Sequence, residues 1–149
     1  MTPATHFRRA PIRGFTLIEL LVVIVVIGVL AALVAPNVFR HVGAAKDAAA
    51  RSQIEMLGAA LDAYRLDTGR YPTGEQGLAA LWVKPGVEPR PASWRGPYLR
   101  KDVPLDPWQH PYIYRSPATA SRGGYDLLSY GEDGREGGDG DAADILSWK

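Results

Sequence analysis

Residues 15–35 read FTLIELLVVIVVIGVLAALVA, and this stretch decides how the rest of the chain is organised. It is apolar throughout except for Thr16 and Glu19. A helix that crosses the hydrocarbon core of a bilayer needs about 20 apolar residues, and this stretch is long enough to supply them. We therefore expect a helix that spans a membrane near the N-terminus.

The segment 1–14 precedes this apolar stretch and carries Arg8, Arg9 and Arg13 without any acidic residue. Positive charge before the first span favours a cytoplasmic N-terminus, so the remainder of the chain should lie across the membrane. A cleaved secretory signal is one alternative, although its apolar core is normally shorter than this one. A signal anchor that is never processed is another.

Glu19 stands out within the apolar stretch, because a carboxylate in a membrane span is costly and is usually paired. Arg13 could reach it from the preceding segment, which is the simplest explanation. Alternatively, cleavage between Gly14 and Phe15 would create a new amino group at Phe15. If a neighbouring, staggered chain presented that amino group to the carboxylate, Glu19 would set the register of an assembly.

Composition excludes several classes of protein. The 149 residues carry 17 Lys and Arg against 16 Asp and Glu, so no basic face for nucleic acid is expected. Cysteine is absent, which excludes a thiol nucleophile, a thiolate metal site and a disulfide framework. His6, His41 and His110 lie in no pattern typical of catalysis, and we do not expect an enzyme.

Residues 37–67 have a helical composition, rich in alanine and free of proline. One apolar stripe recurs there at spacings of three and four, formed by Ile54, Leu57, Leu61 and Tyr64. Thr68 and Gly69 then supply a stop signal. We expect one helix that continues from the membrane span through Pro36, where proline tends to bend the axis. A hairpin of two helices and an isolated amphipathic helix are the alternatives.

A change in composition after this helix marks a small domain, which holds most of the prolines and glycines and all four tryptophans. A short helix is expected within residues 74–81, after a turn. Residues 112–114 and 125–129 have strand character and are predicted to pair as an antiparallel hairpin. Because so small a sheet needs a face to cover, we expect it to pack on the apolar stripe. The predicted fold class is therefore α+β.

Residues 131–144 form a glycine-rich loop in which Arg135 alone opposes the negative charge. Its acidic residues are Glu132, Asp133, Glu136, Asp139, Asp141 and Asp144. Carboxylates at this density repel one another unless they are solvated or bridged by a hard cation, and calcium accepts carboxylate and backbone carbonyl oxygens. The spacing is not that of an EF-hand, so a solvated acidic turn and a calcium site both stay open.

The segment RGFTLIE, residues 13–19, resembles the class III signal of type IV pilins and related pseudopilins. In that family a prepilin peptidase cuts after the glycine, here Gly14, and methylates the new N-terminal residue, here Phe15. Three further parts of the chain resemble the major, or core, pseudopilins of type II secretion systems, within the type IV pilin-like superfamily. They are residues 63–78, residues 106–112, and a C-terminal loop matched at residues 130–134, 143–145 and 148. The chain departs from that pattern at Gln109, where the family usually has glycine.

The resemblance implies a pilin-like fold, in which a long helix packs on a small antiparallel sheet beside a metal-binding loop. The implied parts are a cleaved leader (1–14), a transmembrane and filament-core helix (15–35), an amphipathic half-helix (36–68) and a periplasmic globular domain (69–149). The chain would be anchored in the inner membrane by a single span, with its N-terminus cytoplasmic.

The implied function is structural: the chain would polymerise into a periplasmic pseudopilus that drives export of folded proteins across the outer membrane. Its implied partners are further copies of itself, minor pseudopilins, the prepilin peptidase, and the inner-membrane platform with its cytoplasmic ATPase. Nucleic acid is not among them. A type IV pilin for adhesion, motility or DNA uptake is the alternative. A membrane-tethered binding module that never polymerises is a third possibility.

The resemblance also implies a structural calcium ion in the acidic loop. Its candidate ligands are Tyr130, Asp133, Arg135, Asp139, Asp141 and Asp144. By position, Asp133 would contribute its carboxylate, whereas Tyr130 and Arg135 would contribute backbone carbonyls. The later ligands are a choice among the remaining acidic residues, because Ala143 stands where the family has one of two acidic residues.

Overall fold

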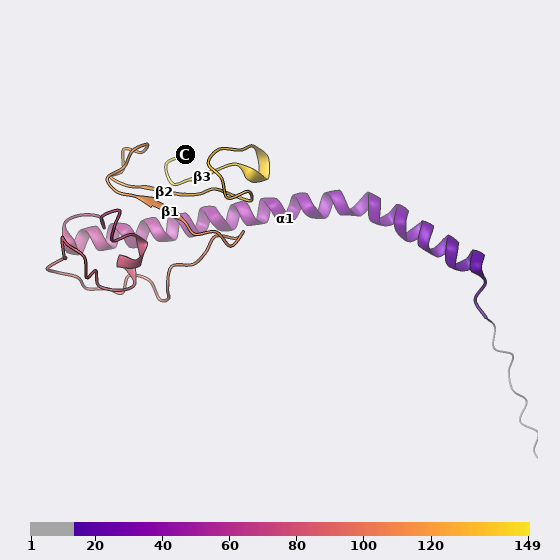
Figure 1. Cartoon of the computed structure of the whole chain (residues 1–149), viewed down its shortest axis with the longest axis horizontal. Coiled ribbons are helices and arrows are strands. Elements are labelled where there is room, and N and C mark those ends of the chain that lie inside the picture. The colour runs from indigo at the N-terminus through magenta and orange to yellow at the C-terminus, as the bar shows by residue number, and fades with distance from the viewer. Residues whose placement is uncertain (1–13) are drawn as a thin grey trace, which may run out of the picture. The chain divides into compact units, whose positions relative to one another are not determined.

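The computed structural model describes residues 14–149, without the side chains of residues 35–40 and 141. The chain forms two compact units, Met1–Arg40 and His41–Lys149 (Figure 1). The predicted leader lies outside the described residues except for Gly14. The predicted domain boundaries stay predictions.

A single α-helix, α1, spans Leu17–Thr68 and continues through Pro36, so the chain does not adopt the alternative helical hairpin. Its first part, Leu17–Val34, has a mean hydropathy of 3.2 over 18 residues and is long and apolar enough to cross a membrane. The side chains of this part are exposed on all sides of the helix. A helix that is apolar all round requires an apolar environment, either lipid or other helices.

The end of α1 has a glycine stop of the kind that the sequence predicts. The Thr68 hydroxyl donates a hydrogen bond to the Tyr64 carbonyl at 2.8 Å. Gly69 adopts a positive φ of 82°, and its N–H donates to the Arg65 carbonyl at 2.7 Å. This left-handed residue satisfies a carbonyl that the last turn of a helix otherwise leaves open.

One antiparallel sheet lies beside the second part of α1, within the His41–Lys149 unit (Figure 1). Its strands, in the order β1-β2-β3, are Ile113–Arg115, Asp126–Ser129 and Ile145–Leu146. Leu128 of β2 lies opposite Ile113 of β1 and Leu146 of β3. The predicted hairpin of β1 and β2 is confirmed, whereas β3 was not predicted.

The core of the second unit lies between α1, the sheet and a short 3₁₀ helix, η1 (Leu78–Leu81). The predicted helical stripe is buried, with Leu57 and Leu61 fully inaccessible to solvent. The residues packed against it include Leu78, Leu81, Leu99, Tyr112, Leu127 and Ile145. The helix expected within residues 74–81 is therefore shorter than predicted, because only Leu78–Leu81 are helical and the residues before them form the predicted turn.

Asp126 is a buried carboxylate that fixes the connection between β1 and β2. Its Oδ2 accepts hydrogen bonds from the Thr119 N–H at 2.7 Å, the Thr119 hydroxyl at 2.9 Å and the Ala120 N–H at 2.9 Å. Its Oδ1 accepts from the Ser121 N–H at 2.7 Å. Burial alone would raise the pKa of Asp126, but these hydrogen bonds hold it well below its ordinary value.

This lowered pKa makes the stability of the second unit sensitive to acid. The unfolded state takes up the Asp126 proton first, so the stabilising contribution is complete above pH of about 4 and is lost as the pH falls below it. We expect the free energy of unfolding to fall over this range, and to fall less steeply in Asp126→Asn. Urea unfolding of the full chain in a non-ionic detergent, followed by tryptophan fluorescence, measures this.

The exposed substitution Glu75→Gln is the matched control and should keep the wild-type pH profile. All four tryptophans lie in the second unit, so the fluorescence reports on this unit alone. A pH profile of Asp126→Asn that superimposes on that of the wild type would contradict the assignment.

Candidate functional site

The first candidate site is the start of α1, where Phe15 and Glu19 were predicted to act in processing and assembly. The Phe15 side chain is 79% exposed, and Glu19 lies in the first helical turn. The Thr16 hydroxyl accepts a hydrogen bond from the Glu19 N–H at 3.3 Å. Thr-x-x-Glu is the pattern of a capping box, and a negative charge in the first turn also favours the helix dipole.

The sequence reasoning missed this cap, although the pattern could have been read from residues 16–19; the observed bond uses the backbone N–H of Glu19 and the hydroxyl of Thr16. The structure does not test cleavage after Gly14 or the pairing of Glu19 with another chain. Both stay predictions. Because a glutamine at this position can still complete a capping box, the charge and the cap can be separated by experiment.

The second candidate site is the acidic loop, residues 131–144, which connects β2 to β3 and is drawn in yellow in Figure 1. It contains one 3₁₀ turn, η2 (Gly140–Ala142). Gly138 has a positive φ of 90°, and a Cβ there would lie 2.3 Å from the Ala142 carbonyl oxygen. The tight return of the loop therefore requires glycine at this position.

Two carboxylates close the acidic loop through backbone donors. Asp133 Oδ1 accepts a hydrogen bond from the Arg135 N–H, and Asp144 Oδ2 accepts one from the Gly137 N–H, both at 3.0 Å. The other oxygen of Asp144, Oδ1, is buried and has no hydrogen-bond partner among the described residues. A buried carboxylate oxygen without a donor is costly, and a cation with oxygen ligands would satisfy it.

The predicted ligands are only partly brought together. Asp133 and Arg135 are linked by their hydrogen bond, whereas Asp144 is linked to Gly137 instead. Asp139 precedes η2, and its carbonyl accepts from the Ala142 N–H at 3.3 Å.

The Tyr130 hydroxyl accepts a hydrogen bond from Arg115 Nη2 at 3.0 Å, and the predicted role of its backbone carbonyl stays a prediction. The side chain of Asp141 lies outside the described residues. Within the described part of the chain, no group of three or more His, Cys, Asp or Glu side chains is placed to hold a metal ion. A cation in the loop would therefore need backbone carbonyls as ligands.

A buried polar network fixes the beginning of the acidic loop. Asp106, 1% exposed, accepts a hydrogen bond from the Ser129 hydroxyl at the end of β2. The same hydroxyl oxygen accepts from the Gly131 N–H at 3.2 Å. Asp106 Oδ1 also accepts from the backbone N–H groups of Trp108 at 3.0 Å and His110 at 2.8 Å. Ser129 thereby ties the turn at 106–110 to the first residue of the loop.

His110 and Tyr112 extend this network. His110 Nδ1 lies 3.1 Å from the Gly131 carbonyl oxygen and 3.9 Å from Asp106 Oδ2. Burial first, and the charge of Asp106 second, raise the pKa of Tyr112 well above its ordinary value. Tyr112 therefore stays neutral and donates its hydroxyl hydrogen to Gln53 of α1.

The turn at 106–110 contains Gln109, the residue that departs from the expected family pattern of glycine. Gln109 adopts a φ of 73°, the left-handed region in which glycine is strongly preferred. Its N–H donates to the Asp106 carbonyl at 2.9 Å, which closes the turn. The sequence reasoning recognised this turn but not the roles of Asp106, Ser129 and His110. The available signal was the Asp-Pro-Trp sequence, because aspartate favours such side-chain-closed turns.

Comparison with protein families gives two matches that together cover the apolar helix and the second unit. Residues 37–148 match the family described as type II secretion system (T2SS), protein G. Residues 9–35 match the prokaryotic N-terminal methylation motif.

Similar proteins and a similar solved structure agree with these matches. The chain is 47% identical to the type II secretion system core protein G of Pseudomonas aeruginosa over 91% of this chain and 94% of that protein. It is 44% identical to the protein of the same name from Vibrio cholerae, over 91% of this chain and 90% of that one. The crystal structure of the major pseudopilin from the type 2 secretion system of enterohaemorrhagic Escherichia coli is similar, with a TM-score of 0.64 at 38% identity, over 76% of this chain and 95% of that one.

The Asp106–Ser129 contact predicts a large effect from a small change. Ser129→Ala removes the donor to Asp106 Oδ2 and leaves that buried carboxylate oxygen unsatisfied, which should lower the free energy of unfolding by about 1–3 kcal/mol. Urea unfolding of the full chain in detergent, followed by tryptophan fluorescence, measures the change. Ser147→Ala, at an exposed position, is the control. A loss no larger than that of the control would show that the network does not hold the loop.

Proposed function

Because the chain belongs to the type II secretion system protein G family, we propose that it polymerises into the periplasmic pseudopilus whose growth drives folded proteins across the outer membrane. Its role is structural and not enzymatic. The relatives are core proteins of type II secretion, and the similar structure is a major pseudopilin, which favours this function over that of a type IV pilin.

The observation that carries the proposal is the composition of α1. Its first part, Leu17–Val34, exposes apolar side chains on every face, whereas its later part buries one stripe under the sheet. Such a helix is stable in two environments: the lipid of a membrane before assembly, and a bundle of identical helices afterwards. A membrane-anchored subunit that leaves the lipid for a filament core needs both.

The orientation and the specific partners belong to the same proposal. Arg8, Arg9 and Arg13 precede the span and favour a cytoplasmic N-terminus. The His41–Lys149 unit would then lie on the periplasmic side of the inner membrane. The partners would be further copies of the chain, minor pseudopilins, the prepilin peptidase, and the inner-membrane platform with its cytoplasmic ATPase. The match to the N-terminal methylation motif supports the peptidase among them.

We infer that Glu19 aligns the copies. After cleavage between Gly14 and Phe15, the new amino group of one copy would neutralise the Glu19 carboxylate of its neighbour. In a dry helical bundle this pairing is worth far more than at a surface, because an unpaired carboxylate there is strongly unfavourable.

Glu19→Gln tests this role and spares the helix cap. Glutamine can complete the capping box but carries no charge, so the chain should be processed and inserted normally yet yield few or no filaments. Mass spectrometry of the membrane-extracted chain checks processing as the loss of residues 1–14 and the gain of one methyl group at Phe15. Electron microscopy of sheared filaments checks assembly.

Thr16→Ala is the matched control, since it removes the cap and keeps the charge. It should be processed and should assemble. Normal filaments from Glu19→Gln would contradict the pairing, and an unprocessed N-terminus in the wild type would contradict the whole proposed function.

We also propose that the acidic loop holds a structural calcium ion. The ligands would be the carboxylates of Asp133 and Asp144 with the carbonyls of Tyr130 and Arg135. Asp141 would be the further carboxylate, since the described acidic side chains, Asp139 included, form no group of three placed to hold an ion. The unpartnered, buried Oδ1 of Asp144 supports this assignment. Calcium, when bound, would supply the positive charge that a loop of crowded carboxylates lacks.

Calcium should therefore raise the melting temperature of the second unit in the full chain, as any ligand that binds only the folded state does. Asp144→Asn keeps an oxygen for the Gly137 N–H but loses the charge, and should abolish the increase. Tryptophan fluorescence during heating, in detergent with calcium or with a chelator, measures both. Glu75→Gln should respond as the wild type does. Superimposable wild-type melting curves with calcium and with chelator would overturn the assignment.

A further inference from the structure

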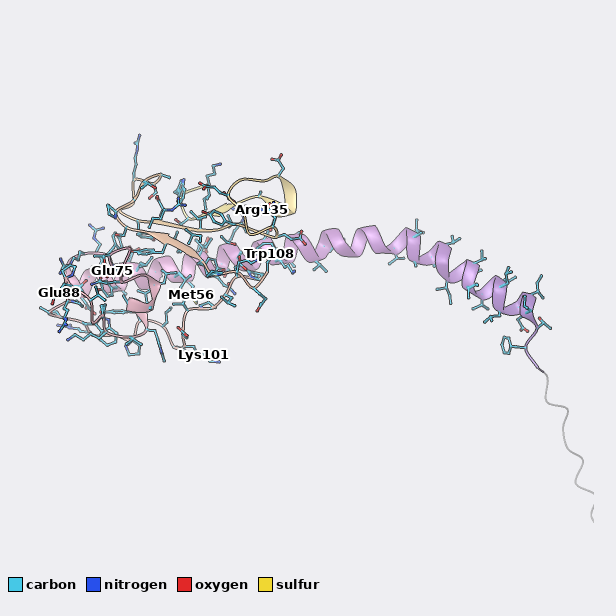
Figure 2. The ribbon with its side chains drawn as sticks, in the orientation of Figure 1. Met56, Glu75, Glu88, Lys101, Trp108 and Arg135 are labelled. Carbon is cyan, nitrogen blue, oxygen red and sulfur yellow. The ribbon has the colours of Figure 1, made fainter. Side chains whose placement is uncertain are left out.

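A groove opens along the exposed side of α1 in the second unit, away from the acidic loop. It has a volume of about 690 Å³ and lies between about two turns of α1, residues 56–63, and the segment 98–104. Its lining includes Met56, Ala59, Ala63, Tyr98, Leu99 and Pro104. The helical side of the groove is built from short side chains, so the backbone of another chain can approach it closely. Figure 2 shows Met56 and Lys101 in this region.

Two cations stand at the groove. Arg100 and Lys101 line the groove, are exposed, and form no ion pair within the described part of the chain. The neighbouring Asp102 is exposed and lines the groove as well, so the three side chains together leave one net positive charge there; its Oδ1 accepts a hydrogen bond from the Val103 N–H at 2.8 Å. The groove therefore combines an apolar floor with a positive rim.

The acidic loop offers a complementary surface. Glu132 and Glu136 are exposed, belong to no proposed calcium ligand set, and form no ion pair among residues whose side chains the structure describes. Glycines surround them, including Gly134 and Gly137. Asp133, Gly134 and Arg135 lie between the two glutamates, and the glycine allows a close turn from which both glutamates can reach the rim of a groove.

These two surfaces cannot meet within one copy. The acidic loop lies next to the Trp108 turn, and Trp108 is near Lys46 of α1, with Lys46 Nζ 5.9 Å from the centre of its ring. The groove lies at Met56, which is about 15 Å further along the helix axis at 1.5 Å per residue. Figure 2 shows this separation, with Arg135 and Trp108 together and Met56 and Lys101 further along α1.

We propose that the groove of one copy receives the acidic loop of a second copy, with Glu132 and Glu136 paired to Arg100 and Lys101. The proposal rests on the proposed function and deepens it, because it names the surfaces by which the globular parts associate. The groove and the acidic loop are different surfaces, so each copy can bind one neighbour through its groove and another through its loop. A head-to-tail contact of this kind that does not close into a ring produces a filament. The charge pairs orient the copies, and the groove excludes water from the contact.

Cross-linking tests the contact directly, and the absence of cysteine from the chain gives a clean background. Lys101→Cys and Glu136→Cys chains are produced together in cells that carry the secretion system, and filaments are treated with a short bismaleimide. We expect cross-linked dimers from this pair and none from Lys101→Cys with Glu75→Cys, since Glu75 is exposed but lies outside both surfaces.

Charge reversal gives the second arm. Glu132→Lys with Glu136→Lys should lower the filament yield by about tenfold, and Arg100→Glu with Lys101→Glu should do the same. The chain that combines all four changes restores opposite charges and should recover most of the yield. Glu75→Lys with Lys84→Glu, a reversal at exposed positions elsewhere, should leave the yield unchanged.

Filaments that contain the Lys101→Cys and Glu136→Cys chains but give no cross-link, together with normal filament yields from both charge reversals, would overturn this contact and leave the proposed function intact. A loss of yield that the combined reversal does not recover would also count against the pairing. A wild-type chain that forms no filament would overturn both proposals.

Discussion

The packing of a minimal sheet on one stripe of α1 is the interaction on which the second unit depends. Strands of three, four and two residues cannot persist in water without a face to cover. Leu57 and Leu61 supply that face and are fully buried. Burying a side chain of this size contributes about 1.5–3 kcal/mol, so a few such residues decide whether the unit folds. The acidic loop is in turn attached to this sheet, between β2 and β3.

Buried carboxylates form a second level of organisation on the same sheet. Asp126 at the start of β2 gathers the backbone donors of the preceding loop, and Ser129 at its end joins Asp106 to Gly131. In a low-dielectric interior an unpaired carboxylate is costly, so each of these groups allows only one path for the chain around it. The start of the acidic loop is thus held in place by Ser129 and Asp106, which are not part of the loop.

The sequence predicted the features that repeat. The stripe that includes Leu57 and Leu61 follows from helical spacing, and the β1–β2 hairpin follows from two apolar runs with a polar connection between them. β3 was missed because two residues carry no periodicity. The bond between Ser129 and Asp106 was missed because it joins residues 23 positions apart, and only the folded chain brings them together.

For the candidate sites, Glu19 and the loop acids could be selected from their charge and from a resemblance, because each is conspicuous in its surroundings. The cap at Thr16 was overlooked although its pattern is local. The partner of a loop carboxylate is a different matter: that Asp144 keeps one oxygen without a donor depends on the folded path of the whole loop.

The two edge strands of the sheet, β1 and β3, are too short to pair stably with a strand of another chain. In the described part of the chain, β1 and β3 each pair only with β2, so each leaves an outer edge unpaired. Pro111 and Pro117 flank β1, and proline cannot donate to a growing ladder. These features disfavour the edge-to-edge stacking of strands between copies of the chain that leads to amyloid.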